Sequence, residues 1–282
     1  MSAVLIPTCL DQALDLLAEH PDALPLAGGT DLLVRLRARD PGSAPPLLSL
    51  ARIEQLQGVA EHSSFLAIGA ATPFARILAD PLVERHAPLV AQAARTIGGP
   101  AVRNMATIGG NIATASPAGD SLPPLCLHDA RIELASPAGR RVLPLDAFLH
   151  GPGRTARQQG ELITRILLPK APPFSRERFV KVGRRRAHAI SVTSFAGLAR
   201  LDDEGVIADI RMAWGSVGPT VVRLPGLEAE LVGVRVDRAP LGHIHQTVHQ
   251  GVSPLSDLRA SAEYRRLVAA NLAVRFVEAL GD

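Results

Sequence analysis

Hydrophobic positions in the first fifty residues change spacing repeatedly, which indicates short strands separated by helices. Runs of consecutive apolar residues predict three strands, at residues 4–7, 24–27 and 47–50. Apolar residues at helical spacing predict two helices, at residues 8–20 and 32–37. An alternating β-α-β-α-β order of this kind favours a small parallel sheet.

The pattern of predicted strands and helices changes in the next hundred residues. A strand is predicted from Phe65, followed by a helix with Thr72 as its cap and Pro73 at its first position. Residues 88–97 form another predicted helix, which the Gly-Gly-Pro that follows would end. Residues 131–145 read as a β-hairpin with its turn in the Pro-Ala-Gly sequence.

The last third of the chain is predicted to form a separate domain. Residues 170–178 are rich in proline and charge and are the best candidate linker. Beyond them, residues 191–218 alternate as strands, and a final helix covers residues 261–280. The predicted apolar side of that helix carries Leu267, Ala270, Val274 and Val277. The expected fold class is therefore α+β, with two glycine-loop subdomains at residues 1–53 and 54–170 and a C-terminal α+β domain at residues 175–282.

Composition removes several classes of function. The chain has 282 residues, of which 47% are hydrophobic and 20% charged, as in a globular protein. Only 3% are aromatic, and the net charge of +3 is not gathered in a basic stripe, so nucleic-acid binding is not expected. Two distant cysteines provide neither a disulfide framework nor ligands for an iron–sulfur cluster within this chain. Neither a signal peptide nor a membrane span is visible, so we expect a cytoplasmic protein.

The first candidate site is the stretch "LPLAGGTDLLVRLR", Leu24 to Arg37. A predicted strand ends in two glycines, a hydroxyl and a carboxylate, and a helix follows. The unpaired N–H groups at the start of such a helix form a cradle for an anion. The motif alone does not name the anion.

The second candidate site is "ATIGGNIATASPAGD", Ala106 to Asp120. Gly109 and Gly110 have no Cβ and would let the backbone approach a ligand closely. Asp120 supplies an acceptor suited to sugar-type hydroxyls. Two such loops would suit a long ligand with a phosphate centre and hydroxylated arms.

Other motifs are weaker. No P-loop sequence is present, and "GPGRTA", residues 151–156, matches a dinucleotide fingerprint only as a string, because Pro152 removes a donor. His243, His245 and His249 could in principle reach a metal, but a solvated helix face is the better interpretation. Lys181, one of only two lysines, could serve a flavin or ribityl group, although by composition alone it reads as a surface residue.

Five stretches together resemble a known family: "AGGTDLL", "TIGGNIATASPAGD", "FVKVGRRRAHAIS", "GSVGPTVVR" and "SPLSDLRASAEYRR". They are similar to the FAD-binding medium subunits of molybdenum hydroxylases, the group of xanthine dehydrogenase and carbon monoxide dehydrogenase. The resemblance runs from about residue 4 to residue 278. It implies a vanillyl-alcohol-oxidase-type (PCMH) fold, in which the first two subdomains bind FAD.

The resemblance also assigns residues to the cofactor. The first loop would wrap the pyrophosphate, the second would lie near the phosphates and flavin, Asp120 would bind hydroxyls, Ile163 would pack near the adenine, and Lys181 would contact the cofactor. The implied set is Leu26, Ala27, Gly28, Gly29, Thr30, Asp31, Leu33, Thr107, Ile108, Gly109, Gly110, Asn111, Asp120, Ile163 and Lys181. Where many relatives have Asp-Tyr, with the tyrosine over the flavin, this chain has Ala189 and Ile190.

By resemblance, the protein is a subunit of an oxidoreductase. Electrons would come from two [2Fe–2S] clusters on a small subunit, beside a large molybdopterin-binding subunit, and would leave to NAD⁺ or another acceptor. The assembly implied is a dimer of heterotrimers, and no catalytic acid–base residues are expected in this chain. Two alternatives stay open at this stage: a free-standing flavin oxidoreductase, and a nucleotide-binding scaffold with no redox role.

Overall fold

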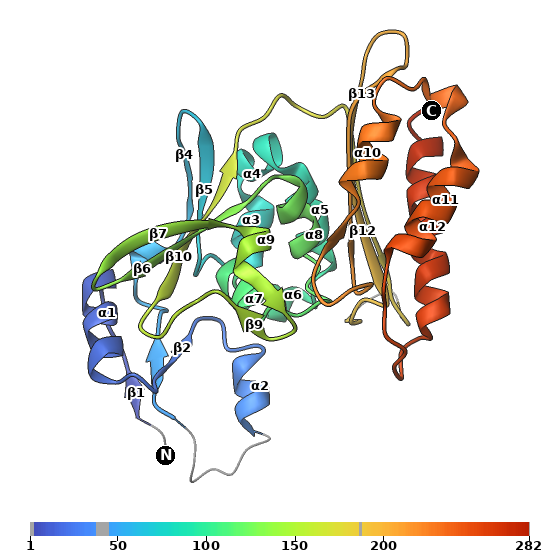
Figure 1. The fold of residues 1–282 in the computed structure, drawn as a ribbon. Coiled ribbons are helices and arrows are strands. Elements are labelled where there is room, and N and C mark those ends of the chain that lie inside the picture. The colour runs from blue at the N-terminus through green and yellow to red at the C-terminus, as the bar shows by residue number, and fades with distance from the viewer. Residues whose placement is uncertain (1–2, 38–44, 186–187, 282) are drawn as a thin grey trace. The chain divides into compact units, whose positions relative to one another are not determined.

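A computed structural model describes residues 3–37, 45–185 and 188–281 of the chain (Figure 1). The chain forms two compact units, which we describe separately. The first contains Met1–Glu84, Gly98–Ala115 and Ala130–Lys170, and the second contains Arg85–Ile97, Ser116–Asp129 and Ala171–Asp282. Helix α4 (Pro81–His86) crosses the boundary between the two sets of residues.

The first unit contains the predicted parallel sheet. Its strands are β1 (Val4–Leu5), β2 (Leu24–Leu26) and β3 (Leu47–Ser49). They pair in parallel, which confirms the predicted parallel sheet, and their order is β1-β3-β2. Helices α1 (Leu10–Glu19) and α2 (Leu32–Arg37) follow β1 and β2.

Helix α1 buries one face, as its periodicity predicted. Leu10, Leu14 and Leu17 pack in a core with Leu48 of β3. In the sequence, Thr8 and Asp11 have the spacing of a capping box and predict a side-chain cap, but this prediction is wrong, because the residue that precedes the helix is Cys9 and makes no side-chain cap. The Gln12 side chain instead accepts a hydrogen bond from the Thr8 N–H at 2.8 Å.

A five-stranded antiparallel sheet forms the rest of the first unit's framework, in the order β4-β5-β10-β6-β7. Its strands are β4 (Val59–Glu61), β5 (Phe65–Gly69), β10 (Leu162–Pro169), β6 (Arg131–Ser136) and β7 (Gly139–Pro144). The β6–β7 pair is the predicted hairpin. Short elements complete this unit: η2 (Glu54–Leu56), α3 (Phe74–Ala79), α6 (Pro100–Met105), α7 (Ile108–Thr114), α9 (Leu145–Phe148), β8 (Leu149–Gly151) and β9 (Arg154–Thr155).

The predicted cap of α3 is wrong. The helix begins at Phe74, one residue later than expected, and Pro73 precedes it. Thr72 is buried, and its hydroxyl donates to the Gly58 carbonyl at 3.1 Å rather than to the helix. The hydroxyl therefore stabilises the loop between η2 and β4, which no sequence motif indicated.

The second unit is built on a four-stranded antiparallel sheet, in the order β11-β12-β13-β14. The strands are β11 (Arg176–Val182), β12 (Thr193–Leu201), β13 (Ile207–Gly215) and β14 (Val222–Arg223). The helices are α5 (Pro88–Thr96), α8 (Leu122–Leu127), α10 (Pro225–Leu231), η3 (Val236–Arg238), α11 (Leu241–Gly251) and α12 (Ala262–Glu278).

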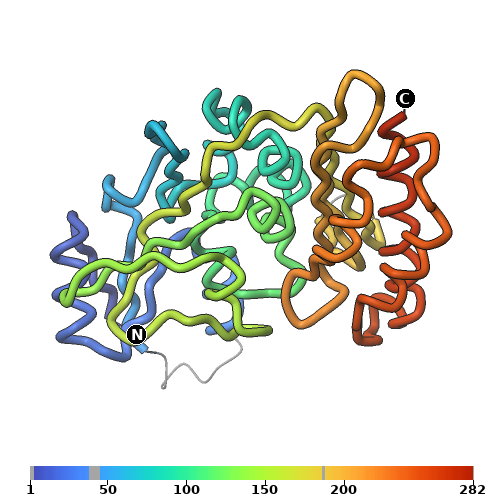
Figure 2. The backbone as a smooth tube through the Cα atoms, turned by 45° about the horizontal axis from the view of Figure 1, so that its top comes forward, coloured from blue at the N-terminus to red at the C-terminus, as the bar shows by residue number. Residues whose placement is uncertain are grey.

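Helices cover both faces of this sheet. On one face Phe195 and Trp214 pack with Phe276 of α12, and the Trp214 indole donates to the Ala269 carbonyl at 3.1 Å. On the other face Ala196, Leu198 and Ala213 pack against Leu89 of α5 and Leu127 of α8. Figures 1 and 2 show α11 and α12 running beside each other over the first of these faces.

The buried side of α12 agrees with the predicted one at Ala270, Val274 and Val277 but not at Leu267. Leu267 is 45% exposed, whereas Ala269, Ala273 and Phe276 are buried with Ala270 and Val277. The contact face therefore combines small alanines with the large Phe276, so it is set by size complementarity with the sheet and not by hydrophobicity alone. Within the described residues, no helix combines the length and apolar character needed to cross a membrane.

Candidate cofactor site

The first glycine loop, Ala27–Asp31, connects β2 to α2 in the first unit, and its two glycines are there for different reasons. Gly29 has a φ of +70°, a left-handed conformation that L side chains rarely adopt. A Cβ on Gly28 would lie 1.8 Å from the Met105 carbonyl oxygen, so any side chain there would force the backbone apart. The backbone of the loop can adopt this conformation only with glycine at both positions.

The loop leaves a run of main-chain donors available. Among the described residues, no acceptor is found for the backbone N–H groups of residues 27–31. Successive unpaired N–H groups in a turn create a concave positive site that suits an anion. The Asp31 side chain is already engaged, accepting from Arg35 at 2.8 Å and from the Thr114 hydroxyl at 3.0 Å. The main chain, not that carboxylate, is therefore the part of the loop that can hold a phosphate.

The second glycine stretch is a helix start rather than an open loop. Thr107 precedes α7, and its hydroxyl accepts a hydrogen bond from the Gly110 N–H at 3.1 Å. The Asn111 N–H donates to the Thr107 carbonyl at 3.0 Å. A Cβ on Gly109 would lie 2.6 Å from both the Cβ and the carbonyl oxygen of Ala70. The close approach expected of a ligand at Gly109 is thus made by Ala70.

The structure brings the two glycine stretches together within the first unit. Gly28 lies against the Met105 carbonyl and the Ala106 Cα, immediately before the second stretch. Asp31 accepts a hydrogen bond from Thr114 at the end of α7. The two predicted walls are therefore neighbours, although about eighty residues separate them in sequence. Leu26 and Leu33 flank the first wall, since both side chains lie within 3.3 Å of where a Gly29 Cβ would be.

Ile163 lies close to the second wall through the backbone. It is buried in β10, opposite Leu134 of β6. The carbonyl of the next residue, Thr164, accepts from the Ala70 N–H at 3.0 Å, and the Ala70 carbonyl accepts from the Gly109 N–H at 2.9 Å. A packing role of Ile163 beside the adenine stays a prediction.

Asp120 and Lys181 belong to the second unit and form a buried ion pair there. The Lys181 ammonium lies 2.6 Å from Asp120 Oδ2 and donates to the Thr96 carbonyl at 3.0 Å. The Ser191 hydroxyl donates to Asp120 Oδ1. Burial raises the pKa of the Asp120 carboxyl above its ordinary value, while Lys181 and Ser191 partly oppose that effect.

Sequence reasoning missed Ser191 and Thr96. Ser191 is fully buried and is the last residue of the family-like stretch "FVKVGRRRAHAIS", but a serine at that position does not indicate that its partner is Asp120. Thr96 contributes only a backbone carbonyl at the end of α5, which no residue type could indicate. Both partners depend on the pairing of distant segments, and the sequence held no signal for that pairing.

The weaker motifs have structural explanations. Residues 151–156 form the β8–β9 hairpin, with no strand-to-helix turn. His243 and His249 pair with Glu230 and Glu263 at 2.8 and 2.9 Å. Among the described residues, no group of three or more potential ligands could hold a metal ion. Ile190, which stands where many relatives have tyrosine, is 62% exposed.

Comparison with known proteins identifies the family. Residues 1–171 match the family described as "FAD binding domain in molybdopterin dehydrogenase", and residues 178–280 match "CO dehydrogenase flavoprotein C-terminal domain". The chain belongs to the FAD-binding medium subunits of molybdenum hydroxylases. The family resemblance expected from the sequence, and the α+β PCMH-type fold that came with it, are thereby confirmed.

Individual relatives agree with this assignment. The chain is 35% identical over 259 residues to the putative xanthine dehydrogenase FAD-binding subunit of Escherichia coli (strain K12), covering 91% of this chain and 88% of that one. It is 30% identical over 276 residues to the carbon monoxide dehydrogenase medium chain of Hydrogenophaga pseudoflava, covering 97% and 94%. A solved structure of carbon monoxide dehydrogenase from Hydrogenophaga pseudoflava that lacks the Mo-pyranopterin moiety matches with a TM-score of 0.91 and 30% identity, over 99% of this chain and 97% of that one.

Family membership makes this medium subunit an oxidoreductase flavoprotein with FAD as its cofactor and a component of multi-subunit molybdenum hydroxylase complexes. The residues present fit that cofactor. The loop at residues 27–31 offers main-chain donors to a pyrophosphate, and at Gly28 the backbone approach leaves no room for a Cβ.

Proposed function

We propose that this chain carries electrons from the [2Fe–2S] clusters of a small partner subunit to a terminal acceptor such as NAD⁺. The clusters would be reduced by a large molybdopterin-binding subunit, and the assembly would be a dimer of heterotrimers. Family membership supports this role, and so does the absence of cluster ligands in the sequence, since two cysteines cannot hold a cluster.

The observation that carries the proposal is the run of main-chain N–H groups at residues 27–31, beside α7, for which the described residues provide no acceptor. We assign the pyrophosphate of FAD to these donors. When bound, FAD supplies a centre that accepts electrons singly and releases them as a pair. The chain's own task is to bind that centre, orient it and set its electrostatic surroundings.

The other residues that the family resemblance assigns to the cofactor take supporting roles in the proposal. Thr107, Gly109 and Gly110 fix the wall beside the phosphates, because their hydrogen bonds and close packing hold the start of α7. We keep Asp120 and Lys181 as proposed cofactor contacts. Lys181 has three ammonium protons and, within the part of the chain that the structure describes, two hydrogen-bond acceptors, so one donor is left over for a ligand oxygen.

The test starts with the full chain, co-expressed with its partner subunits and purified as the complex. Its visible spectrum and an acid-extracted FAD assay should give one FAD per medium chain. Anaerobic addition of NADH should then bleach the flavin bands, followed by the iron–sulfur absorbance, because electrons can run backwards through the same path. A complex that binds FAD but is not bleached by NADH excludes NAD⁺ as the acceptor. A complex without FAD contradicts the proposed site.

A further inference from the structure

Two leucines in the second unit are exposed to an unusual degree. Leu255 is 84% exposed and Leu258 is 98% exposed, the highest values among the large hydrophobic side chains that the structure describes. Both lie in the segment Ser253–Ala260, which connects α11 to α12 without regular secondary structure. Ile190, in the segment that precedes β12, is a further exposed apolar residue at 62%. Two large apolar side chains this exposed on one short loop point to a binding surface.

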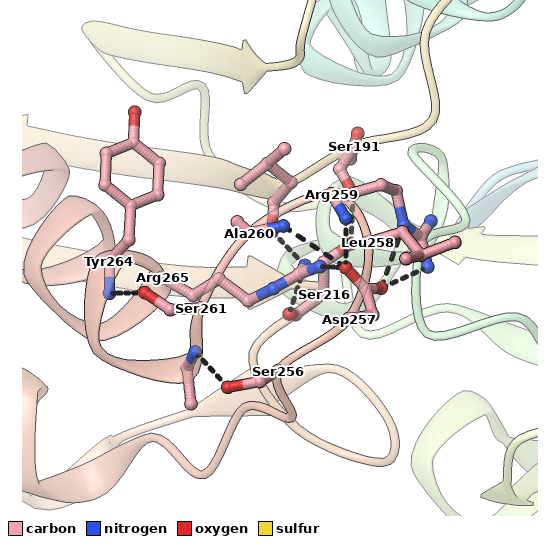
Figure 3. Close-up of polar contacts among 12 residues, drawn as sticks. Ser191, Ser216, Ser256, Asp257, Leu258, Arg259, Ala260, Ser261, Tyr264 and Arg265 are labelled. Carbon is pink, nitrogen blue, oxygen red and sulfur yellow. Dashed lines mark hydrogen bonds and ion pairs between the residues drawn. The ribbon is translucent and has the colours of Figure 1, made fainter.

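The loop that presents the leucines is firmly held by Asp257. This carboxylate accepts from the Arg259 N–H at 2.8 Å, the Ala260 N–H at 3.3 Å and the Arg259 Nε at 2.9 Å (Figure 3). It also forms an ion pair with Arg265 at 2.7 Å. These bonds to its charged form hold the pKa of Asp257 below its ordinary value, the Arg259 N–H most of all. Because the Asp257 carboxylate makes all of these bonds, its role is to stabilise the conformation of the loop.

Arg265 links the loop to the sheet through hydrogen bonds and an ion pair. It is only 3% exposed, and its guanidinium donates to the carbonyl of Val192, which precedes β12. It also donates to the carbonyl of Ser216, which follows β13 (Figure 3). At the loop's other end, the Ser253 N–H donates to the Val217 carbonyl at 2.9 Å. The leucines therefore protrude from a preorganised loop, which lowers the conformational entropy lost when a partner covers them.

The surroundings of the leucines are positively charged. Arg184 is exposed and donates to the Leu258 carbonyl at 3.3 Å, and Arg185 next to it is also exposed. Arg259 lies on the loop itself, and its side chain is 37% exposed. The loop's carboxylate, Asp257, is neutralised by Arg259 and Arg265. A complementary surface would present an apolar pocket with carboxylates at its rim.

We propose that the segment Ser253–Ala260 is a docking element for another subunit of the molybdenum hydroxylase complex, which receives Leu255 and Leu258 in an apolar pocket rimmed by carboxylates. The proposal rests on the proposed role of the chain as a subunit that works with partners. The charge pattern argues against a second copy of the same surface, because two arginine-rimmed loops would repel each other. The rigid anchoring by Arg265 suits a fixed protein partner.

The test compares full-length variants co-expressed with the large and small subunits, one of which carries an affinity tag. Leu255→Asp combined with Leu258→Asp should reduce the amount of this chain that co-purifies by about tenfold or more, as expected when central apolar anchors are lost. Leu258→Ser is the milder form, and Arg184→Glu tests the charge. The matched control is Val232→Asp, at an exposed valine that follows α10, which should co-purify as the wild type does.

Each variant is also purified alone, and its melting temperature and FAD content should equal those of the wild type, which separates docking from folding. Hydrogen exchange should slow at residues 253–260 when the partners are present. If the double variant assembles normally while the wild type assembles, the docking assignment is wrong and the proposed function stands. If the wild type does not assemble with either co-expressed subunit, the proposed function itself fails.

Two other binding partners of the segment Ser253–Ala260 would give different experimental results. Dimers of the isolated wild-type chain that the leucine variants abolish would assign the loop to a second copy and overturn the proposal. Leucine-dependent pelleting with vesicles of phosphatidylserine and phosphatidylcholine would assign it to a lipid surface and overturn it equally.

Discussion

The Lys181 ammonium lies 2.6 Å from a carboxylate oxygen of Asp120, and the two side chains are only 11% and 7% exposed. The same ammonium donates to the carbonyl of Thr96, the last residue of α5. A cation at a helix C-terminus is favourable because the last carbonyl groups carry partial negative charge. Lys181 is therefore held in place by two interactions besides any that it makes with a cofactor.

Replacing Lys181 with methionine should destabilise the protein by about 3 kcal/mol, because a buried carboxylate is left without its counter-ion. The pKa of Asp120 is already raised by burial and should rise further in this variant. A carboxyl with a raised folded-state pKa contributes stability at low pH that is lost as pH rises through that pKa. The variant's deficit relative to the wild type should therefore grow with increasing pH.

Urea unfolding of the wild type and Lys181→Met at pH 5 and pH 8 measures this effect. The double variant Lys181→Met with Asp120→Asn is the control, since it removes both charges and should recover part of the loss. Equal stability of the wild type and Lys181→Met at pH 8 would contradict a structural role for the ion pair.

Glu177 stands at the opposite end of α5 from Lys181, and both come from the same face of β11. The Leu89 N–H near the start of α5 donates to its carboxylate, while burial dominates and raises the pKa of Glu177 to about 7. One of its oxygens, Oε2, is buried without a hydrogen-bond partner among the described residues. The ionised form is thus poorly solvated above neutral pH.

We expect Glu177→Gln to stabilise the protein at pH 8 by about 1 kcal/mol, a value kept low because the side chain is only partly buried. The amide oxygen can still accept from Leu89, so the contact with α5 is kept. In the wild type, the raised pKa of Glu177 contributes stability at low pH that is lost as pH rises from 4.5 through about 7. The glutamine variant has no carboxyl to ionise there and should show no such loss. Thermal unfolding between pH 5 and pH 8.5 checks the difference, and parallel pH profiles for both proteins would refute it.

The fold could be predicted where local pattern determines structure. The parallel pairing of β1, β2 and β3, though not their order, followed from short apolar runs between helices, and the β6–β7 hairpin followed from its turn residues. The buried face of α12 could be predicted only in part: Ala270 and Val277 are buried as expected, but Ala269 and Ala273 rather than Leu267 fit against the sheet. Which residues fit there depends on the opposing surface of Phe195 and Trp214, which is formed by other segments.

The candidate site, like the fold, could be predicted only in part from the sequence. The glycines of both stretches were visible because the turn and the close approaches require that residue type at those positions. Their contacts were not visible, because Met105 and Ala70 take part through backbone atoms that any residue would offer. Ser191 was missed for a related reason, since a lone serine carries no pattern until folding places it against Asp120.

Thr107→Ala should destabilise the protein by about 1 kcal/mol, the usual cost of a lost N-cap. The Thr107 hydroxyl is the acceptor for the Gly110 N–H, and the same turn lies beside the first glycine loop. Thr107→Ser keeps the hydroxyl and should keep the stability and the FAD content of the wild type. The measurements are chemical unfolding and FAD stoichiometry. If alanine and serine behave alike in both, the cap does not matter.

Gly28→Ala is the most direct test of the first glycine loop. The added methyl group would lie 1.8 Å from the Met105 carbonyl oxygen, so the two walls must separate. We expect a loss of about 3 kcal/mol in unfolding free energy, at the upper end for overpacking, together with loss of FAD from the purified chain. The matched control is Gly226→Ala in α10, where an added Cβ meets nothing within 4 Å. It should gain about 0.5–1 kcal/mol from higher helix propensity and keep its FAD. A Gly28→Ala protein with full FAD content would show that the cofactor does not depend on this contact between the loops.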